Sequence, residues 1–219
     1  MEVIEQIESL LALREEARIK DKPLLIWEPR PSSCIPPNLQ DFFQAVQKVD
    51  IFTPNHVELA GVFGYPKSEP PSRATVETFA LNFLGSDIGG QRTVVIRAGE
   101  EGCFIADNQT REWLPAYHEP TRVEGIVTGS SAKIIDHTGA GNAFIGAFAI
   151  GYLSTNSIYD AACYGNVGAS FAMEQIGLPN LSQSEDREHW NGANPLSDPL
   201  LRLKEYRSRL KRSNEGAEY

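Results

Sequence analysis

The amino-acid sequence predicts an α/β fold, a three-layer sandwich in which helices cover both faces of a mostly parallel sheet. The first observation is that short apolar runs, typical of buried strands, alternate along the chain with segments of helical periodicity. The second is that proline or glycine follows several of these runs, as at Pro29, Pro54 and Gly99. Because such sheets bind ligands beyond the carboxyl ends of their strands, the turns after the strands are the candidate site.

The predicted elements follow from apolar spacing and from residues typical of helix and strand ends. Asn38, Asn55 and Ser72 are expected to begin three of the helices, and the β-branched run Thr93–Ile96 is the clearest strand. Residues 111–132 are expected to form an irregular connection. Helices are predicted at residues 3–17, 38–49, 55–59, 72–84, 140–153 and 157–173, and strands at 23–28, 50–53, 93–96, 103–106 and 133–135.

Composition narrows the classes of partner. The chain carries a formal charge of −9, and an acidic surface repels phosphates, so no nucleic-acid partner is expected. Residues 1–17 are charged throughout and hold no long apolar run, so neither a signal peptide nor a membrane partner is expected. Three dispersed cysteines are typical of reduced thiols, which indicates a cytoplasmic protein. The basic run Arg202–Arg212 is interpreted either as a solvated helix face or as a docking tail for an acidic partner.

The segment Asp136–Gly146 is the most informative part of the sequence. The turn Gly139-Ala140-Gly141 leads into a helix of small residues, and the first N–H groups of a helix lack partners within it. These groups lie at the positive end of the helix, so the turn predicts an anion site, with phosphate the usual anion. A phosphotransferase would carry a carboxylate base next, whereas this chain has Asn142, which cannot act as a base at neutral pH. The alternative is a tight turn whose small residues serve packing alone.

Three further segments allow both a structural and a functional interpretation. Asn55 and Glu58 form a capping box, or they orient a hydrated Mg²⁺ beside phosphates. The run Gly99–Gly102 is a hairpin turn, or a loop that approaches nucleotide phosphates with the charge of Arg97 nearby. The small residues at 164–170 allow close helix packing, or they leave room for a flat adenine ring.

In this order the four segments resemble the PfkB family of carbohydrate kinases, which have the ribokinase-like fold. The family's signature is close to Asp-Thr-x-Gly-Ala-Gly-Asp-x-Phe-x-Gly, and residues 136–146 read Asp-His-Thr-Gly-Ala-Gly-Asn-Ala-Phe-Ile-Gly. The Asn-x-x-Glu at residues 55–58, the loop at 99–102 and Asn166 support it. Trp27-Glu28-Pro29, together with residues 53–59, looks most like a fungal branch of the family.

The resemblance implies a kinase that binds ATP and Mg²⁺, with a nucleotide and a sugar as its small-molecule partners. It also implies a monovalent cation such as K⁺ beside the glycine turn, and backbone N–H groups as the anion hole for the transferred phosphoryl group. The implied residues are Gly139, Ala140, Gly141 and Asn142 for catalysis, Arg97, Gly99, Gly102 and Asn166 for the nucleotide, Asn55 and Glu58 for Mg²⁺ and phosphate, and Asp136 and Thr138 for the monovalent cation.

Several features depart from the family pattern. Asn142 stands where the family has its catalytic Asp, and His137 replaces a small or β-branched residue. No Gly-Gly-x-x-x-x-Asn element precedes Trp27, so the chain is expected to lack the family's N-terminal sugar-binding part and its lid. Loss of central strands would expose a sheet edge, and an exposed edge favours association, including homo-oligomers. We therefore expect a ribokinase-like nucleotide-binding core at residues 1–180 and a polar extension with a short basic helix at 181–219.

Three functions fit this pattern. The first is a PfkB-like carbohydrate kinase domain that transfers phosphoryl from ATP to a sugar-type hydroxyl and is impaired by Asn142. The alternative is a non-catalytic nucleotide-binding or regulatory pseudokinase of the same fold, because phosphate binding depends on positioning and charge rather than on the base. A third is a structural fragment that works only when paired with another chain.

Overall fold

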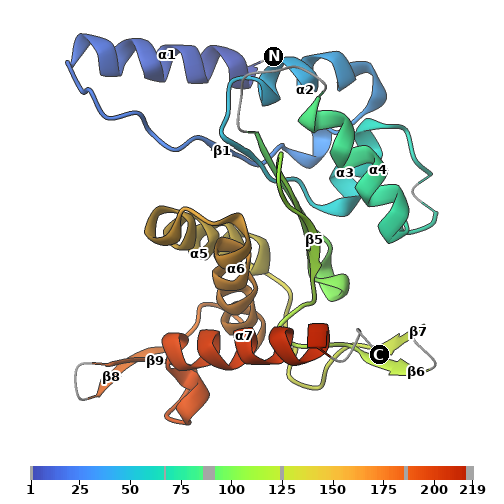
Figure 1. The fold of residues 1–219 in the computed structure, drawn as a ribbon, viewed down its shortest axis with the longest axis vertical. Coiled ribbons are helices and arrows are strands. Elements are labelled where there is room, and N and C mark those ends of the chain that lie inside the picture. Colours follow the sequence, from blue (N-terminus) through green and yellow to red (C-terminus); the bar gives the residue numbers. More distant parts are fainter. Residues whose placement is uncertain (1, 67, 86–91, 124–125, 185–186, 216–219) are drawn as a thin grey trace. The chain divides into compact units, whose positions relative to one another are not determined.

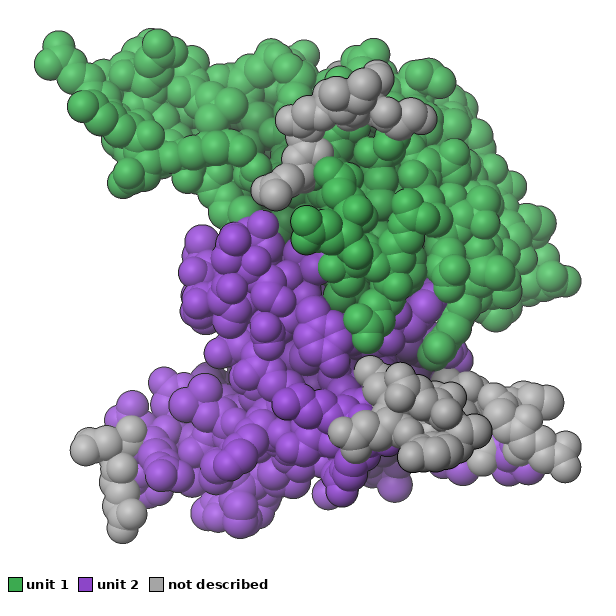
Figure 2. Space-filling model, viewed as in Figure 1, with its two compact units in different colours: residues 1–97, 104–112 green, residues 98–103, 113–219 purple. Residues whose placement is uncertain are grey.

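Figure 1 shows the computed structural model of the chain, with its helices and strands labelled. The structure describes residues 2–66, 68–85, 92–123, 126–184 and 187–215. The chain divides into two compact units, coloured in Figure 2. Unit 1 comprises residues 1–97 and 104–112, and unit 2 comprises residues 98–103 and 113–219. The boundary that we place at residue 180 between core and extension stays a prediction.

A five-stranded sheet of order β1-β2-β3-β4-β5 organises the fold. Its first three strands, β1 (Ile26–Trp27), β2 (Ile51–Phe52) and β3 (Thr93–Arg97), pair in parallel. The strands β4 (Cys103–Ala106) and β5 (Arg111–Leu114) follow in the same sheet. The predicted α/β class with its mostly parallel central sheet is confirmed.

Three helices of unit 1 bury their apolar faces in a core rich in aromatic rings. They are α2 (Leu39–Val46), α3 (His56–Val62) and α4 (Arg73–Leu84), and the ring of Phe52 on β2 lies 5.0 Å from that of Phe83 on α4. The fourth helix, α1 (Glu2–Glu16), forms as the apolar spacing predicts.

Helix ends in unit 1 follow their capping chemistry in two of three cases. The side chains of Asn55 and Ser72 accept hydrogen bonds from Glu58 N and Thr75 N, as caps do. Asn38 was expected to cap α2 in the same way, but its amide donates to Ser33 O (2.9 Å) instead. A preceding 3-10 turn, η2 (Pro36–Asn38), already directs the chain into α2.

In unit 2, the helices α5 (Ala140–Thr155) and α6 (Ile158–Met173) lie side by side (Figure 1). A Cβ atom on Gly165 would lie 2.7 Å from the ring of Phe144, and one on Gly168 would lie 2.5 Å from the Cβ of Ala147. Real side chains do not approach so closely, so glycine is required at both positions. Close helix packing therefore accounts for Gly165 and Gly168, and the alternative of room for an adenine ring stays a prediction.

Residues 111–135 differ from the expected pattern. The predicted strand at 133–135 is absent: Ile134 N donates to Ser131 O (3.0 Å), and the amides of Ile135 and Asp136 both donate to Met173 O (2.8 and 3.2 Å). The end of α6 thus takes the donors that a neighbouring strand would need. The predicted irregular connection contains β5 and a hairpin. The remaining elements are η1 (Pro31–Ser33), η3 (Gly99–Glu101), η4 (Pro195–Ser197), β6 (Thr121–Val123) paired with β7 (Ile126–Gly129), and β8 (Leu181–Ser184) paired with β9 (Arg187–Trp190).

The basic run near the C-terminus lies in a long helix, α7 (Pro199–Glu215), that is anchored in unit 2. Arg202 is only 4% exposed, and its guanidinium lies 2.7 Å from Glu174 Oε1 and 3.6 Å from the centroid of the Phe171 ring. His118 Nε2 lies 3.0 Å from the same carboxylate oxygen. Arg202 therefore belongs neither to a solvated face nor to a free docking tail. It lies on the side of α7 that packs against the rest of unit 2, and it is buried together with the apolar residues of that side.

Two further expectations concern membranes and cysteines. Within the described ranges, no helix combines the length and the apolar character that crossing a membrane requires. All three cysteines, Cys34, Cys103 and Cys163, are buried, and none of them forms a disulfide bond.

We predict that Arg202→Ala lowers the free energy of unfolding by about 3–5 kcal/mol, because it leaves the partly buried carboxylate of Glu174 without its cation. Lys204→Ala is the matched control: Lys204 is exposed on the same helix, so its loss should change stability by less than about 0.5 kcal/mol. Urea unfolding of both variants measures the difference. Equal effects would show that the buried pair does not anchor α7.

Acid should weaken this network in a defined pH window. Burial alone would raise the pKa of Glu174, but the hydrogen bond from His118 and the charge of Arg202 outweigh it and lower the pKa from 4.5 to about 2. A carboxyl group whose pKa is lowered by folding stabilises the fold above its unfolded pKa. We therefore expect stability to fall as the pH drops from 4.5 towards 2, and the difference between Glu174→Gln and the parent to shrink over that range. A pH-independent difference would contradict this.

Candidate active site

In unit 1, polar side chains gather where the parallel strands β1, β2 and β3 end. Glu28, Thr53 and Arg97 stand at these three carboxyl ends, which share one edge because the strands are parallel. The Arg97 guanidinium forms an ion pair with Glu28, lies 3.1 Å from Thr53 O, and lies 3.7 Å from Glu58 Oε2. One cation therefore connects the ends of all three strands with the start of α3.

Asn55 and Glu58, two predicted site residues, form a complete capping box. Asn55 Oδ1 accepts from Glu58 N, and Glu58 Oε2 accepts from Asn55 N, both at 2.8 Å. Glu58 is 7% exposed, and its burial raises the pKa of the carboxyl group against the opposing effects of the Asn55 N–H and Arg97. Asn55 and Glu58 thus form the predicted capping box, and the same geometry holds the carboxylate of Glu58 at the sheet edge where a ligand would bind.

Glu28 is a residue of this edge that the sequence interpretation missed. It was placed at the end of a strand and in the combination Trp27-Glu28-Pro29, but it was not assigned to the site, although it directly follows β1. The rule that parallel strands end at one edge could have found it.

The oxygen atoms at this edge are of the kind that a hydrated Mg²⁺ binds, although the guanidinium of Arg97 already pairs with both carboxylates. Among the residues that the structure describes, no three His, Cys, Asp or Glu side chains gather as a full metal-ligand set. Mg²⁺ keeps most of its waters and needs only one or two carboxylates, which Glu28 and Glu58 supply here. Thr53 Oγ1 is buried and has no hydrogen-bond partner in the described part of the chain.

In unit 2, the glycine turn at the start of α5 is open to solvent. Gly139 is the N-cap with φ +84, and a Cβ atom there would meet nothing within 4 Å. Ala140 N donates to His137 O (3.2 Å), whereas no partner is recorded, within the described ranges, for the amides of Gly141 and Asn142. Two of the three predicted N–H donors are therefore available, in a turn that is not packed inside the protein.

Asp136 and Thr138, the predicted cation ligands, lie together before this turn. Asp136 Oδ1 accepts from Thr138 N (2.9 Å) and from its hydroxyl (2.8 Å). These two hydrogen bonds lower the pKa of the Asp136 carboxyl group, which is therefore ionised at neutral pH. An ionised carboxylate beside a hydroxyl oxygen is suitable chemistry for a monovalent cation.

The predicted nucleotide residues of unit 2 have different surroundings. Gly99 has φ +58 and open space at its Cβ position, whereas a Cβ on Gly102 would lie 2.0 Å from Leu114 O. Gly102 is thus required by its contact with β5. Asn166 is 5% exposed, and its amide donates to the hydroxyl of Tyr206 at 3.0 Å. The structure brings Asn166 to α7, a contact that no local sequence pattern indicated.

Comparison with known proteins gives the family. The model of the pfkB family carbohydrate kinases matches residues 8–185, and the chain belongs to this family. The chain is 36% identical over 202 residues to an uncharacterized protein of Schizosaccharomyces pombe, covering 89% of this chain and 54% of that protein. It is 32% identical over 205 residues to protein MAK32 of Saccharomyces cerevisiae, covering 90% and 52%. The predicted resemblance to a fungal branch is confirmed.

The chain spans about half the length of these curated relatives. Among solved structures, the ribokinase of Thermotoga maritima matches with a TM-score of 0.50 and 23% identity, over 74% of this chain and 46% of that chain. This likeness supports the ribokinase-like fold.

We predict that Gly139→Ala destabilises the chain by about 1–2 kcal/mol, because its positive φ is unfavourable for any residue with a Cβ. Gly146→Ala in the same helix is the control: its Cβ also meets nothing within 4 Å, and replacing a helical glycine should stabilise by up to about 1 kcal/mol. Urea unfolding tests the pair. Similar effects at both positions would mean that the turn does not depend on the conformation of Gly139.

Proposed function

We propose that this chain is a carbohydrate kinase domain that transfers the terminal phosphoryl group of ATP to a hydroxyl group of a sugar-type acceptor. The observation that carries the proposal is the open turn at the start of α5, where Gly141 and Asn142 have amides without recorded partners in the described part of the chain. Unpaired N–H groups at the positive end of a helix bind phosphate. The turn also carries the signature of the family to which the chain belongs.

Several of the predicted residues have a role in this proposal. The amides of Gly141 and Asn142 donate to oxygens of the transferred phosphoryl group and stabilise its developing charge. Asp136 and Thr138 hold a monovalent cation such as K⁺ beside the turn, while Asn55 positions Glu58 for hydrated Mg²⁺. Gly99 leaves room at the β3–β4 turn for the nucleotide. When bound, Mg²⁺ neutralises phosphate charge.

Asn142 limits this chemistry. Its amide can hydrogen-bond to the acceptor hydroxyl and orient it, but it cannot remove the proton. A general base contributes about 10²–10⁴-fold to such reactions. The other contributions, positioning and charge stabilisation, do not depend on the base. We therefore propose slow transfer with nucleotide binding retained.

The alternative is a nucleotide-binding module without turnover. One observation favours it: Asn142 stands where the family has its catalytic Asp. Under either proposal, Asn166 can contact a nucleotide only after releasing the buried hydroxyl of Tyr206, whose own hydrogen bond to Pro115 O holds it in place. Under this alternative the chain binds ATP·Mg²⁺ and does not hydrolyse or transfer it.

We predict that Asn142→Asp raises the rate of ATP-dependent phosphorylation of a sugar acceptor by about 10²–10⁴-fold, because it restores a carboxylate base at the turn. The measurement is ADP release across a panel of sugars and nucleosides. Asn108→Asp changes the net charge equally in an exposed turn and should leave the rate unchanged. If both variants behave like the parent while ATP·Mg²⁺ still binds by calorimetry, the non-catalytic alternative holds. If no nucleotide binds to the folded chain, both proposals fail.

A further inference from the structure

Three oxygen atoms of unit 1 converge on a single nitrogen atom, Nη2 of Arg97. This nitrogen forms the ion pair with Glu28 Oε1, and it lies 3.1 Å from Thr53 O and 3.7 Å from Glu58 Oε2. Carboxylate and carbonyl oxygens are the ligands that suit Mg²⁺, Ca²⁺ and Mn²⁺. The guanidinium therefore lies where an ion bound by these oxygens would lie.

The three oxygens are held in place by contacts that do not involve the side chain of Arg97. Glu58 Oε2 accepts a hydrogen bond from Asn55 N (2.8 Å) at the start of α3. The amide of Thr53 donates to the backbone of β1 (2.9 Å), and Glu28 directly follows that strand. A variant that lacks the guanidinium would therefore keep these oxygens at the same edge.

The guanidinium of Arg97 acts here as a positive charge rather than as a two-pronged donor. An arginine that recognises a carboxylate by its shape uses two nitrogens in parallel. Within the described ranges, the contacts recorded for this guanidinium all use Nη2, and Nε is buried without a partner. An unpaired buried N–H group is unfavourable, so these contacts do not satisfy the side chain fully.

The edge can hold one cation at a time. The side chains of Arg97 and Glu58 are only 13% and 7% exposed, so little water screens the charges between them. A divalent ion beside the guanidinium would meet a like charge at close range, and such repulsion is strong where water is scarce. Mg²⁺ can therefore reach both carboxylates only after the guanidinium has moved away.

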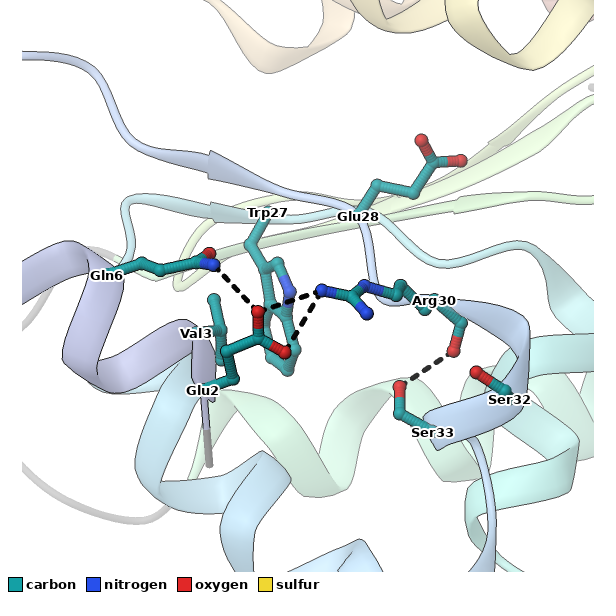
Figure 3. A pocket seen from close by; sticks show the side chains of 8 residues that line it. All are labelled: Glu2, Val3, Gln6, Trp27, Glu28, Arg30, Ser32 and Ser33. Carbon is teal, nitrogen blue, oxygen red and sulfur yellow. Dashed lines mark hydrogen bonds and ion pairs between the residues drawn. The ribbon is translucent and has the colours of Figure 1, made fainter.

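A second arginine in unit 1 gives a direct contrast. Arg30 and Glu28 both line a pocket of about 320 Å³ beside Trp27. Figure 3 shows the carboxylate of Glu28 turned away from Arg30, whose guanidinium pairs with Glu2 instead. The Arg30–Glu2 pair is 72% and 62% exposed and contains one carboxylate, so removal of Arg30 would not create a site for an ion.

We infer that Arg97 is a built-in counter-ion that takes the place of free Mg²⁺ at this edge, so that the chain alone binds no divalent ion there. Loss of its charge would turn the same three oxygens into a divalent-ion site. Phosphate groups pair with guanidinium groups, so a nucleotide would draw Arg97 away and admit Mg²⁺. This last step rests on the proposed kinase function, whereas the exclusion of free Mg²⁺ rests on the edge itself.

The test is a titration of the full chain with Mn²⁺, a paramagnetic substitute for Mg²⁺, without nucleotide. Electron paramagnetic resonance of the free ion measures binding. Broadening of fluorotryptophan resonances, assigned with Trp113→Phe and Trp190→Phe, locates the ion. In the parent, we expect no saturable binding that broadens Trp27 more than the other two. Arg97→Gln should bind Mn²⁺ about tenfold or more tightly than the parent and broaden Trp27, because a positive charge has left the site.

Three further variants show whether the gain depends on this charge and on these oxygens. Arg30→Gln makes the same change of net charge at the exposed pair and should gain no binding. Arg97→Lys keeps the positive charge and should also gain none. Adding Glu58→Gln to Arg97→Gln removes one carboxylate of the new site and should abolish the gain.

Unfolding measurements keep the test decisive if Arg97→Gln is unstable. An ion that binds only the folded chain stabilises it. Mg²⁺ should therefore raise the urea midpoint of Arg97→Gln, or restore its folding, and should leave the midpoint of the parent unchanged. NaCl at equal ionic strength is the control and should have no such effect.

The possible results separate this inference from the proposed function. Saturable Mn²⁺ binding that broadens Trp27 in the parent, or no gain of binding and no stabilisation in Arg97→Gln, would overturn the inference and leave the kinase proposal standing. A chain that binds no ATP would remove the kinase proposal and the step driven by phosphate, while the exclusion of free ions by Arg97 would stand. Broadening of Trp27 by Mn²⁺ in the parent with ATP, and not without it, would support both.

Discussion

The guanidinium of Arg97 is the interaction on which the candidate site depends. It contacts Glu28 after β1, the carbonyl oxygen of Thr53 after β2, and the carboxylate of Glu58 on α3, while Arg97 itself ends β3. A charge with so little exposure is tolerated only when it is paired and hydrogen-bonded. The strand ends, the start of α3 and the wall of the pocket beside Trp27 are therefore fixed together, and removal of this cation would leave two carboxylates facing each other at the sheet edge.

Much of this edge could be predicted because its signals are local. Asn55 and Glu58 are three positions apart, and one helical turn decides their geometry. The positive φ of Gly139 could be predicted from the glycine-rich turn sequence, because glycine is the residue that adopts a positive φ most readily. The alternation of apolar runs gave the parallel strands. Glu28 was missed because the end of a short strand cannot be placed to the residue from apolar character alone.

The remaining misses have distant partners. In the sequence, Arg202 is one charge in a basic run. In the fold it pairs with Glu174, 28 positions earlier, whose carboxylate also contacts His118. A charge pattern records how polar a segment is, and it does not record which carboxylate the segment will meet. The predicted strand at 133–135 failed in the same way, because Met173 O accepts hydrogen bonds from Ile135 N and Asp136 N. The spacing within residues 164–170 did not show that Gly165 packs against Phe144, which is also distant in sequence.

The clamp between Asn166 and Tyr206 has a consequence for substitution at either position. The phenol oxygen receives a hydrogen from the amide and gives its own to Pro115, so both partners are satisfied in the interior of unit 2. A phenylalanine at position 206 would remove the acceptor of the asparagine amide and the donor to a carbonyl group, whereas an aliphatic residue at 166 would leave the phenol with its bond to Pro115 alone. The cost of a change at one position therefore depends on the residue at the other, although 40 residues of sequence separate them.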